Sequence, residues 1–149
     1  MSGDAYITSK QVKAMARELQ NGFNVYLNQD TGEYYALPDI EQYSINGKFD
    51  TEAHRRITDH WDQYIIITCM ESYELFEIME EFMFEVDPEF HFKLLESMYR
   101  KNPLENFQYH VETSEYRDNW LSFFELKYIK YVEDNLISAG LHVEGLKKP

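Results

Sequence analysis

The sequence predicts an α+β fold, in which a small antiparallel sheet packs against a cluster of about five to six helices. Two observations carry this prediction. Runs of β-branched and aromatic residues flank a turn motif near the N-terminus, and in the rest of the chain apolar residues recur at helical spacing. The chain has 149 residues, the length of one domain. We therefore expect 1–149 to be a single domain, ordered over about 8–139, with 140–149 as a frayed tail.

The first expected elements are a helix and a hairpin. Thr8 or Ser9 can cap a helix whose apolar residues recur every three or four positions. Two strands follow, over residues 23–28 and 33–37. The residues between them include an Asp-Thr-Gly sequence, which is turn chemistry, because Asp bonds locally and Gly accepts a positive φ. The N-terminal hairpin is the basis of the predicted sheet.

A short helix and a third strand are expected next. Asp50 or Thr51 can cap the helix, which is predicted to extend to about Trp61 with the indole ring turned inward. The following run, Tyr64–Cys69, is rich in isoleucine and is bounded by polar residues. Such a run is typical of a buried strand, so it completes the predicted sheet.

Four helices are expected in the rest of the chain. The first covers Ser72–Val86 and the second begins at Pro88. Asn102-Pro103 ends the second, and a short third helix contains Leu104, Phe107 and Val111. The last is capped by Ser114 and extends to about Ala139. The apolar stripe of the first of these helices, expected to face the core, consists of Phe76, Met79, Phe82, Met83 and Val86.

The charge of the chain is concentrated between Ile57 and Phe92. This window holds ten carboxylates and neither lysine nor arginine, within a formal net charge of −13. Such a field repels phosphate backbones and anionic lipid surfaces, so we expect neither direct nucleic-acid binding nor membrane binding. A basic protein partner is the expected counterpart. The candidate interaction residues, which share one face of the Ser72–Val86 helix, are Glu74, Glu77, Glu81 and Glu85.

Other interpretations of this acidic face stay open. The four glutamates can simply be the solvated side of an amphipathic helix. Clustered carboxylates can also serve a small-molecule or metal-dependent enzyme, and an acidic face can mimic nucleic acid and occupy a nucleic-acid-binding protein. The twelve tyrosines and ten phenylalanines exceed what a core of this size easily hides. Because exposed tyrosine favours interfaces, a homodimer is a further possibility.

The sequence contains no complete catalytic or metal-binding motif. His54 and His60, with Asp59 and Asp62 nearby, supply metal-ligand types, as do the carboxylates at positions 77, 80 and 81. Neither Glu-x-x-His nor His-Glu-x-x-His occurs. We therefore predict no catalytic residues, no metal site and no cofactor, and the balance leans against an enzyme. Cys69 is the only cysteine, which favours a cytoplasmic location.

Several motifs occur in the order found in one known family. The run Tyr26–Glu33 resembles the Y-L-D-x-x-T-G-E hairpin of the uncharacterised protein family UPF0158, and Phe76–Phe82 is similar to the acidic helix of that family. Phe107 and the run Trp120–Phe123 are similar to its later elements, so the resemblance covers about Val12 to Ile137. It implies a compact cytosolic bacterial domain, and it implies no activity and no catalytic residues.

Overall fold

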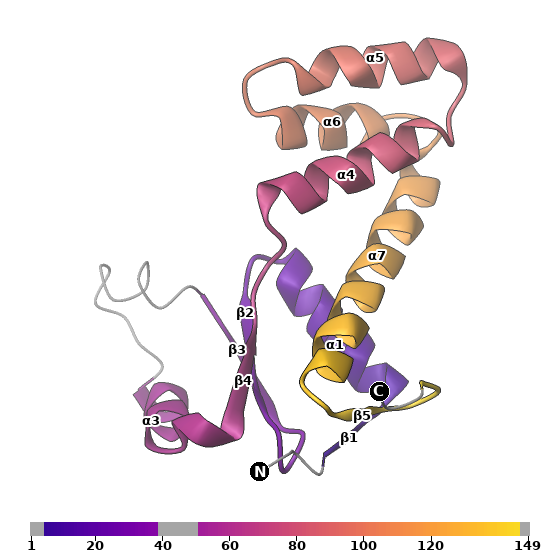
Figure 1. The fold of residues 1–149 in the computed structure, drawn as a ribbon. Helices are drawn as coiled ribbons and strands as arrows, with labels where there is room; N and C mark the ends of the chain where they lie inside the picture. Colours follow the sequence, from indigo (N-terminus) through magenta and orange to yellow (C-terminus); the bar gives the residue numbers. More distant parts are fainter. Residues whose placement is uncertain (1–4, 39–50, 147–149) are drawn as a thin grey trace. The chain divides into compact units, whose positions relative to one another are not determined.

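The computed structural model describes residues 5–38 and 51–146 of the chain. The described residues form six α-helices, a three-stranded antiparallel sheet and a short pair of parallel strands (Figure 1). The predicted α+β class is therefore confirmed. The chain divides into two compact units. Unit 1 consists of Met1–Cys69 and Tyr128–Pro149, and unit 2 consists of Met70–Lys127. The expected organisation as a single domain stays a prediction.

The sheet of unit 1 has the strand order β3-β2-β4. Its strands are β2 (Asn24–Asn28), β3 (Tyr34–Leu37) and β4 (Tyr64–Ile67), within a few residues of the predicted bounds. The prediction that the third strand is buried is wrong, because β4 lies at an edge of the sheet and only its Ile67 is buried. Both neighbours of β2 pair with it in antiparallel register, with Tyr26 opposite Tyr35 on one side and opposite Ile66 on the other. The central strand is buried along most of its length.

The hairpin turn is built by local hydrogen bonds. The side-chain oxygen of Asn28 accepts from the backbone N–H groups of Asp30 and Thr31, at 2.9 and 3.1 Å. Gly32 then takes a φ of +81°, which glycine adopts without steric cost. This is why the turn needs these residue types at these positions.

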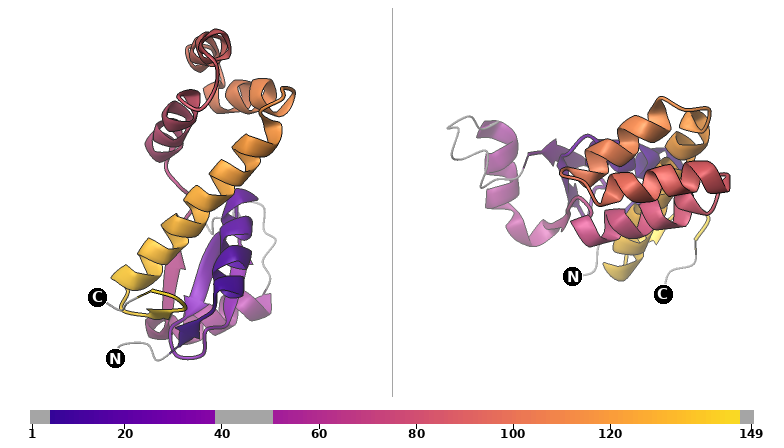
Figure 2. Two further views of the ribbon diagram at one scale, coloured as in Figure 1. Left: turned by 90° about the vertical axis from the view of Figure 1, so that its right-hand side faces the viewer. Right: turned by 90° about the horizontal axis from the view of Figure 1, so that it is seen from above.

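Two helices of unit 1 lie on opposite sides of this sheet (Figures 1 and 2). The first, α1 (Ser9–Gln20), begins at the predicted cap, since Thr8 and Gln11 form a reciprocal capping box. On the other side, α3 (Thr51–Asp59) buries Ala53 and Ile57. The expected placing of the Trp61 ring is wrong. The chain leaves α3 at Asp59 and enters a single 3₁₀ turn, Trp61–Gln63, and the Trp61 side chain is 55% exposed.

The two ends of unit 1 meet in a parallel strand pair that the sequence did not predict. Strand β1 (Tyr6–Ile7) pairs with β5 (His142–Val143), and the Ile7 and Val143 side chains are buried. The carboxylate of Glu144 accepts from the backbone and hydroxyl of Ser9 at the start of α1. Regular structure therefore continues past residue 139, because the segment after the last helix pairs with the N-terminal strand.

Unit 2 is a helical cluster around Trp120. It contains α4 (Ser72–Met83), α5 (Pro88–Met98), α6 (Pro103–Glu112) and the first half of α7 (Arg117–Ser138). The Trp120 ring has centroid distances of 5.2 Å to Phe82, 5.0 Å to Phe107 and 4.9 Å to Phe124. The buried residues of this core are Ile78, Met79, Phe82, Met83, Leu94, Phe107, Val111 and Trp120.

The second half of α7 belongs to unit 1. Its Tyr128, Val132 and Leu136 side chains are buried there, and the Tyr131 hydroxyl donates to the backbone oxygen of Thr68 at 2.9 Å. In the described part of the chain, no helix combines the length and the apolar character needed to cross a membrane.

Candidate interaction surface on α4 and α5

The four glutamates expected to form one row on α4 have different environments. The Glu74 side chain is hydrogen-bonded at the start of the helix, where its carboxylate accepts a hydrogen bond from the backbone N–H of Glu71 at 3.0 Å. This is one half of a capping box, and it holds the Glu74 side chain against its own first turn. Glu74 is therefore half-buried and committed to the helix end rather than free on its face.

Glu81 is also engaged. Its carboxylate forms an ion pair with the Lys127 ammonium of α7, which lies 5.2 Å from the centre of the Phe123 ring. Both charged groups are partly exposed, so the pair adds little to stability. It does remove Glu81 from the carboxylates that are free to meet a partner.

Glu85 lies outside the helix, which corrects the predicted extent of Ser72–Val86. The helix ends at Met83, Phe84 is its C-cap, and the backbone N–H of Glu85 bonds to the Phe82 oxygen in a tight turn. Glu85 is exposed beyond the end of the helix. The predicted row of four therefore does not form on one helix face, while the interaction role of Glu74, Glu77, Glu81 and Glu85 stays a prediction.

The row that is exposed on α4 has a different composition. Tyr73, Glu77 and Glu80 follow at steps of four and three residues on one face of α4, and Phe84, the C-cap four residues further on, continues this row. All four are exposed. Among the residues that the structure describes, neither Glu77 nor Glu80 has a side-chain hydrogen bond or an ion pair. This α4 row thus places two unpaired carboxylates between two exposed aromatic rings.

A groove lies beside this row, between α4 and α5. It encloses about 400 Å³, and the Phe84 and Tyr99 side chains that line it are 81% and 84% exposed. We call it the α4–α5 groove. Its lining residues are Phe76, Glu80, Met83, Phe84, His91, Leu95, Met98 and Tyr99. Glu80 therefore belongs both to the α4 row and to the wall of the groove.

The His91 side chain is held in the groove by contacts with the end of α4. Its Nδ1 lies 2.7 Å from the backbone oxygen of Met83, and because a carbonyl only accepts, Nδ1 donates this hydrogen bond. The imidazole ring also lies beside Phe84, with 5.4 Å between the ring centres. The contact with Met83 and the contact with Phe84 hold the end of α4 against the first turns of α5.

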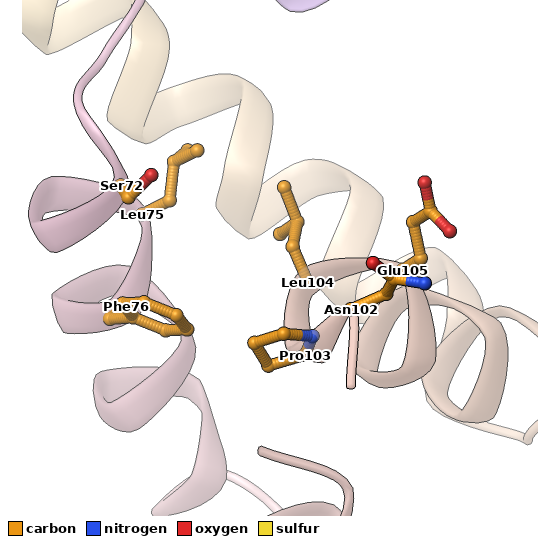
Figure 3. A pocket seen from close by; sticks show the side chains of 7 residues that line it. All are labelled: Ser72, Leu75, Phe76, Asn102, Pro103, Leu104 and Glu105. Carbon is orange, nitrogen blue, oxygen red and sulfur yellow. The ribbon is translucent and has the colours of Figure 1, made fainter. Parts of the chain in front are cut away.

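A second hollow lies next to the groove, between the starts of α4 and α6 (Figure 3). It measures about 260 Å³, and Phe76 lines both this hollow and the α4–α5 groove. Figure 3 shows the Phe76 ring and the Pro103 ring pointing toward one another. Asn102 precedes Pro103 with a φ of 56°, a left-handed conformation that is uncommon for residues other than glycine. The remaining lining residues are Ser72, Leu75, Leu104 and Glu105.

The other chemistry-bearing residues do not converge. Within residues 5–38 and 51–146, no three His, Cys, Asp or Glu side chains lie close enough together to hold a metal ion. The Cys69 thiol is half-buried and lies 3.5 Å from each of two backbone oxygens, those of Leu19 and Phe23. Burial raises the pKa of this thiol, which disfavours the reactive thiolate.

The number of aromatic residues predicts that some tyrosine rings are exposed, and this is confirmed. Tyr99 and Tyr109 are exposed, but Tyr128 is buried, and Tyr43 lies outside the described residues. Sequence reasoning did not single out Phe84. It lies one residue after α4, and its exposure depends on where that helix ends, which the sequence placed at Val86.

Comparison with known protein families identifies the family of this chain. The model of the uncharacterised protein family UPF0158 matches residues 10–143. No curated protein and no solved structure matches this chain.

Proposed function

We propose that this chain, which belongs to the uncharacterised protein family UPF0158, is a non-catalytic interaction module that binds a basic protein partner. The observation that carries the proposal is the α4 row, in which Glu77 and Glu80 are exposed and have no ionic partner among the described residues. The row lies in the window between Ile57 and Phe92, which has neither lysine nor arginine. A basic partner would supply the missing counter-charges.

Electrostatics favour such an encounter in two ways. Glu77 and Glu80 lie three residues apart on one helix and repel one another by a few tenths of a kcal/mol, which a cation between them would relieve. The acidic window also attracts a basic surface over a distance of about 10 Å at moderate salt, so association is faster at low ionic strength. Cys69 is a free thiol, which suits a reducing compartment such as the cytoplasm.

The test is capture of proteins from a lysate of the cells that make this protein. We expect a basic protein to be retained at low salt and released at about 0.5 M salt, because a Debye length of roughly 4 Å screens the exposed charges. The double variant Glu77→Lys/Glu80→Lys should lose this capture. The matched control is Asp59→Lys/Asp62→Lys, which makes the same change in net charge within the same acidic window, on exposed residues of unit 1.

The comparison of these two variants decides the proposal. Equal loss of capture in both variants would mean that net charge, and not the α4 row, attracts the partner. Capture that persists in the Glu77→Lys/Glu80→Lys variant would also contradict the proposal. If added duplex DNA competes with the α4 row for the captured protein, the partner is a nucleic-acid-binding protein and the acidic face acts as a mimic of nucleic acid.

A further inference from the structure

We infer that the α4–α5 groove receives a bulky apolar side chain from a basic amphipathic helix of a protein partner, an inference that rests on the proposed function. The groove is apolar where it is deepest, since the Met83 side chain is buried and Phe76, Leu95 and Met98 are half-buried. Its volume, about 400 Å³, is in the range of sites that enclose a ligand group.

The aromatic rings at the rim of the groove are the side chains whose exposure a bound partner would reduce most. The Phe84 and Tyr99 rings are both more than 80% exposed at its edge. Large exposed aromatic rings beside a concave apolar surface are typical of interaction sites, because burying them against a partner releases ordered water and costs little side-chain entropy. Met83 and Met98, which also line the groove, have flexible side chains that can adjust to the shape of an entering side chain.

Charge determines which occupant fits. Glu80 lines the groove and Glu77 lies one turn earlier on α4, while none of the described lysine and arginine residues lines the groove. A second copy of this chain that presented the same face would bring Glu80 near Glu80, which is unfavourable. A helix that carries leucine-like side chains on one face and lysine or arginine one turn away satisfies both the groove and the two carboxylates.

The geometry of α4 matches this kind of partner. The α4 row and the groove share Glu80 and Phe84, so the acidic surface and the apolar surface are continuous. A helix lying along the groove would meet the carboxylates of Glu77 and Glu80 on its α4 flank. The groove would therefore distinguish amphipathic basic segments from basic segments that have no apolar face, which charge alone cannot do.

The test uses two synthetic helical peptides with identical lysine positions. The first carries leucine on its apolar face and the second carries alanine, which preserves helicity. We expect the leucine peptide to bind at least about tenfold more tightly in fluorescence anisotropy, as truncation of an anchor side chain usually costs this much. The double variant Phe84→Ala/Tyr99→Ala should lower its affinity to that of the alanine peptide.

The chain offers a matched control for this variant. Phe92→Ala/Tyr109→Ala removes the same two side-chain types, which are 66% and 65% exposed on unit 2 but do not line the groove. The control should leave binding of the leucine peptide unchanged. Equal affinity for the two peptides, or equal losses in the two double variants, would overturn the inference.

A spectroscopic measurement keeps the test independent of the variants. With ¹³C-labelled methionine methyl groups, the leucine peptide should shift the signals of Met83 and Met98 and leave Met15, which is buried on α1 of unit 1, unchanged. Shifts confined to other methionines would contradict the groove as the binding site.

The inference and the proposed function fail in different ways. If both peptides bind equally and Glu77→Lys/Glu80→Lys abolishes their binding, the α4 row is confirmed as a binding surface, and the inference that the groove takes an apolar side chain is overturned. If neither peptide binds although the lysate partner is captured, the groove does not accept a basic amphipathic helix. Sedimentation that shows a dimer disrupted by Phe84→Ala/Tyr99→Ala would identify a second copy as the occupant, and would also overturn the inference.

Discussion

The Asp87 side chain joins the start of α5 to Tyr116, the residue before α7, in unit 2. Its carboxylate accepts from the backbone N–H of Phe90 at 2.9 Å, which caps α5, and from the hydroxyl of Tyr116 at 2.7 Å. The Tyr116 hydroxyl oxygen in turn lies 3.1 Å from the backbone N–H of Asp87 and accepts from it. Both hydrogen bonds lower the pKa of Asp87 below its ordinary value, and the bond from Phe90 has the larger effect.

This lowered pKa predicts a specific dependence of stability on pH. A carboxyl group whose pKa is lower in the folded state stabilises the fold above its unfolded pKa of about 4, and this contribution is lost as the pH falls through the folded value. In Asp87→Asn this contribution is missing, so the urea midpoint of the variant should fall less than that of the wild type between neutral pH and pH ~3. Asparagine also caps helices well, so the variant should fold.

A second variant separates the two hydrogen bonds of Asp87. Tyr116→Phe removes the hydroxyl donor and retains the bond from Phe90, so its acid sensitivity should lie between those of the wild type and Asp87→Asn. An identical pH dependence in all three proteins would show that the carboxylate of Asp87 does not contribute to acid unfolding.

At the scale of elements, the pair of β1 and β5 closes unit 1. Val143 is buried, the backbone N–H of Glu144 donates to the Ile7 oxygen at 2.9 Å, and the Glu144 carboxylate binds Ser9. A chain that ends at Leu141 lacks all these contacts. We expect it to lose about 2 kcal/mol of unfolding free energy, mainly from the buried Val143 side chain.

The measurement is a urea titration of two truncated chains. The chain that ends at Leu146 retains β5 and Glu144, and should unfold at the same urea concentration as the full chain. If the chain that ends at Leu141 is equally stable, the strand pair makes no contribution and the N-terminal segment is held by other contacts.

The elements that could be predicted from the sequence are those set by local chemistry. The Thr8 cap, the turn before Gly32 and the start of α5 at Pro88 each depend on a few adjacent residues, and each was predicted. The pair of β1 and β5 depends on contacts between segments more than 130 residues apart, and each strand has only two residues. No local pattern indicates such a pair.

The candidate site was predicted less completely, for a related reason. Apolar spacing assigned Phe76 to the same core stripe as Met79 and Phe82, but only the latter two are fully buried, and Phe76 lines the groove. Periodicity indicates which side of a helix is apolar, and it does not indicate how far the neighbouring helices cover that side. The roles of Glu74 and Glu81 likewise depend on a helix end and on Lys127, a residue of another helix.

At the scale of the whole molecule, α7 is the element that both units share. Trp120 in its first half is buried in unit 2, and Val132 and Leu136 in its second half are buried in unit 1. The helix has 22 residues, so each unit holds about half of it. An isolated helix of that half-length is marginal in water, because helices shorter than about 12 residues seldom form alone.

The sharing of α7 predicts that the two units unfold together, as the single-domain expectation requires. Loss of packing in unit 2 would leave the first half of α7 without support, and the disorder would reach the buried residues of the second half. Calorimetry should therefore show one transition whose calorimetric and van't Hoff enthalpies agree.

Leu126→Pro, at an exposed position near the middle of α7, should break the helix and separate the melting into two steps. Leu126→Ala is the control and should retain a single step, since alanine favours helix and little packing is lost. Two transitions in the wild-type chain would show that the units are independent domains joined by α7.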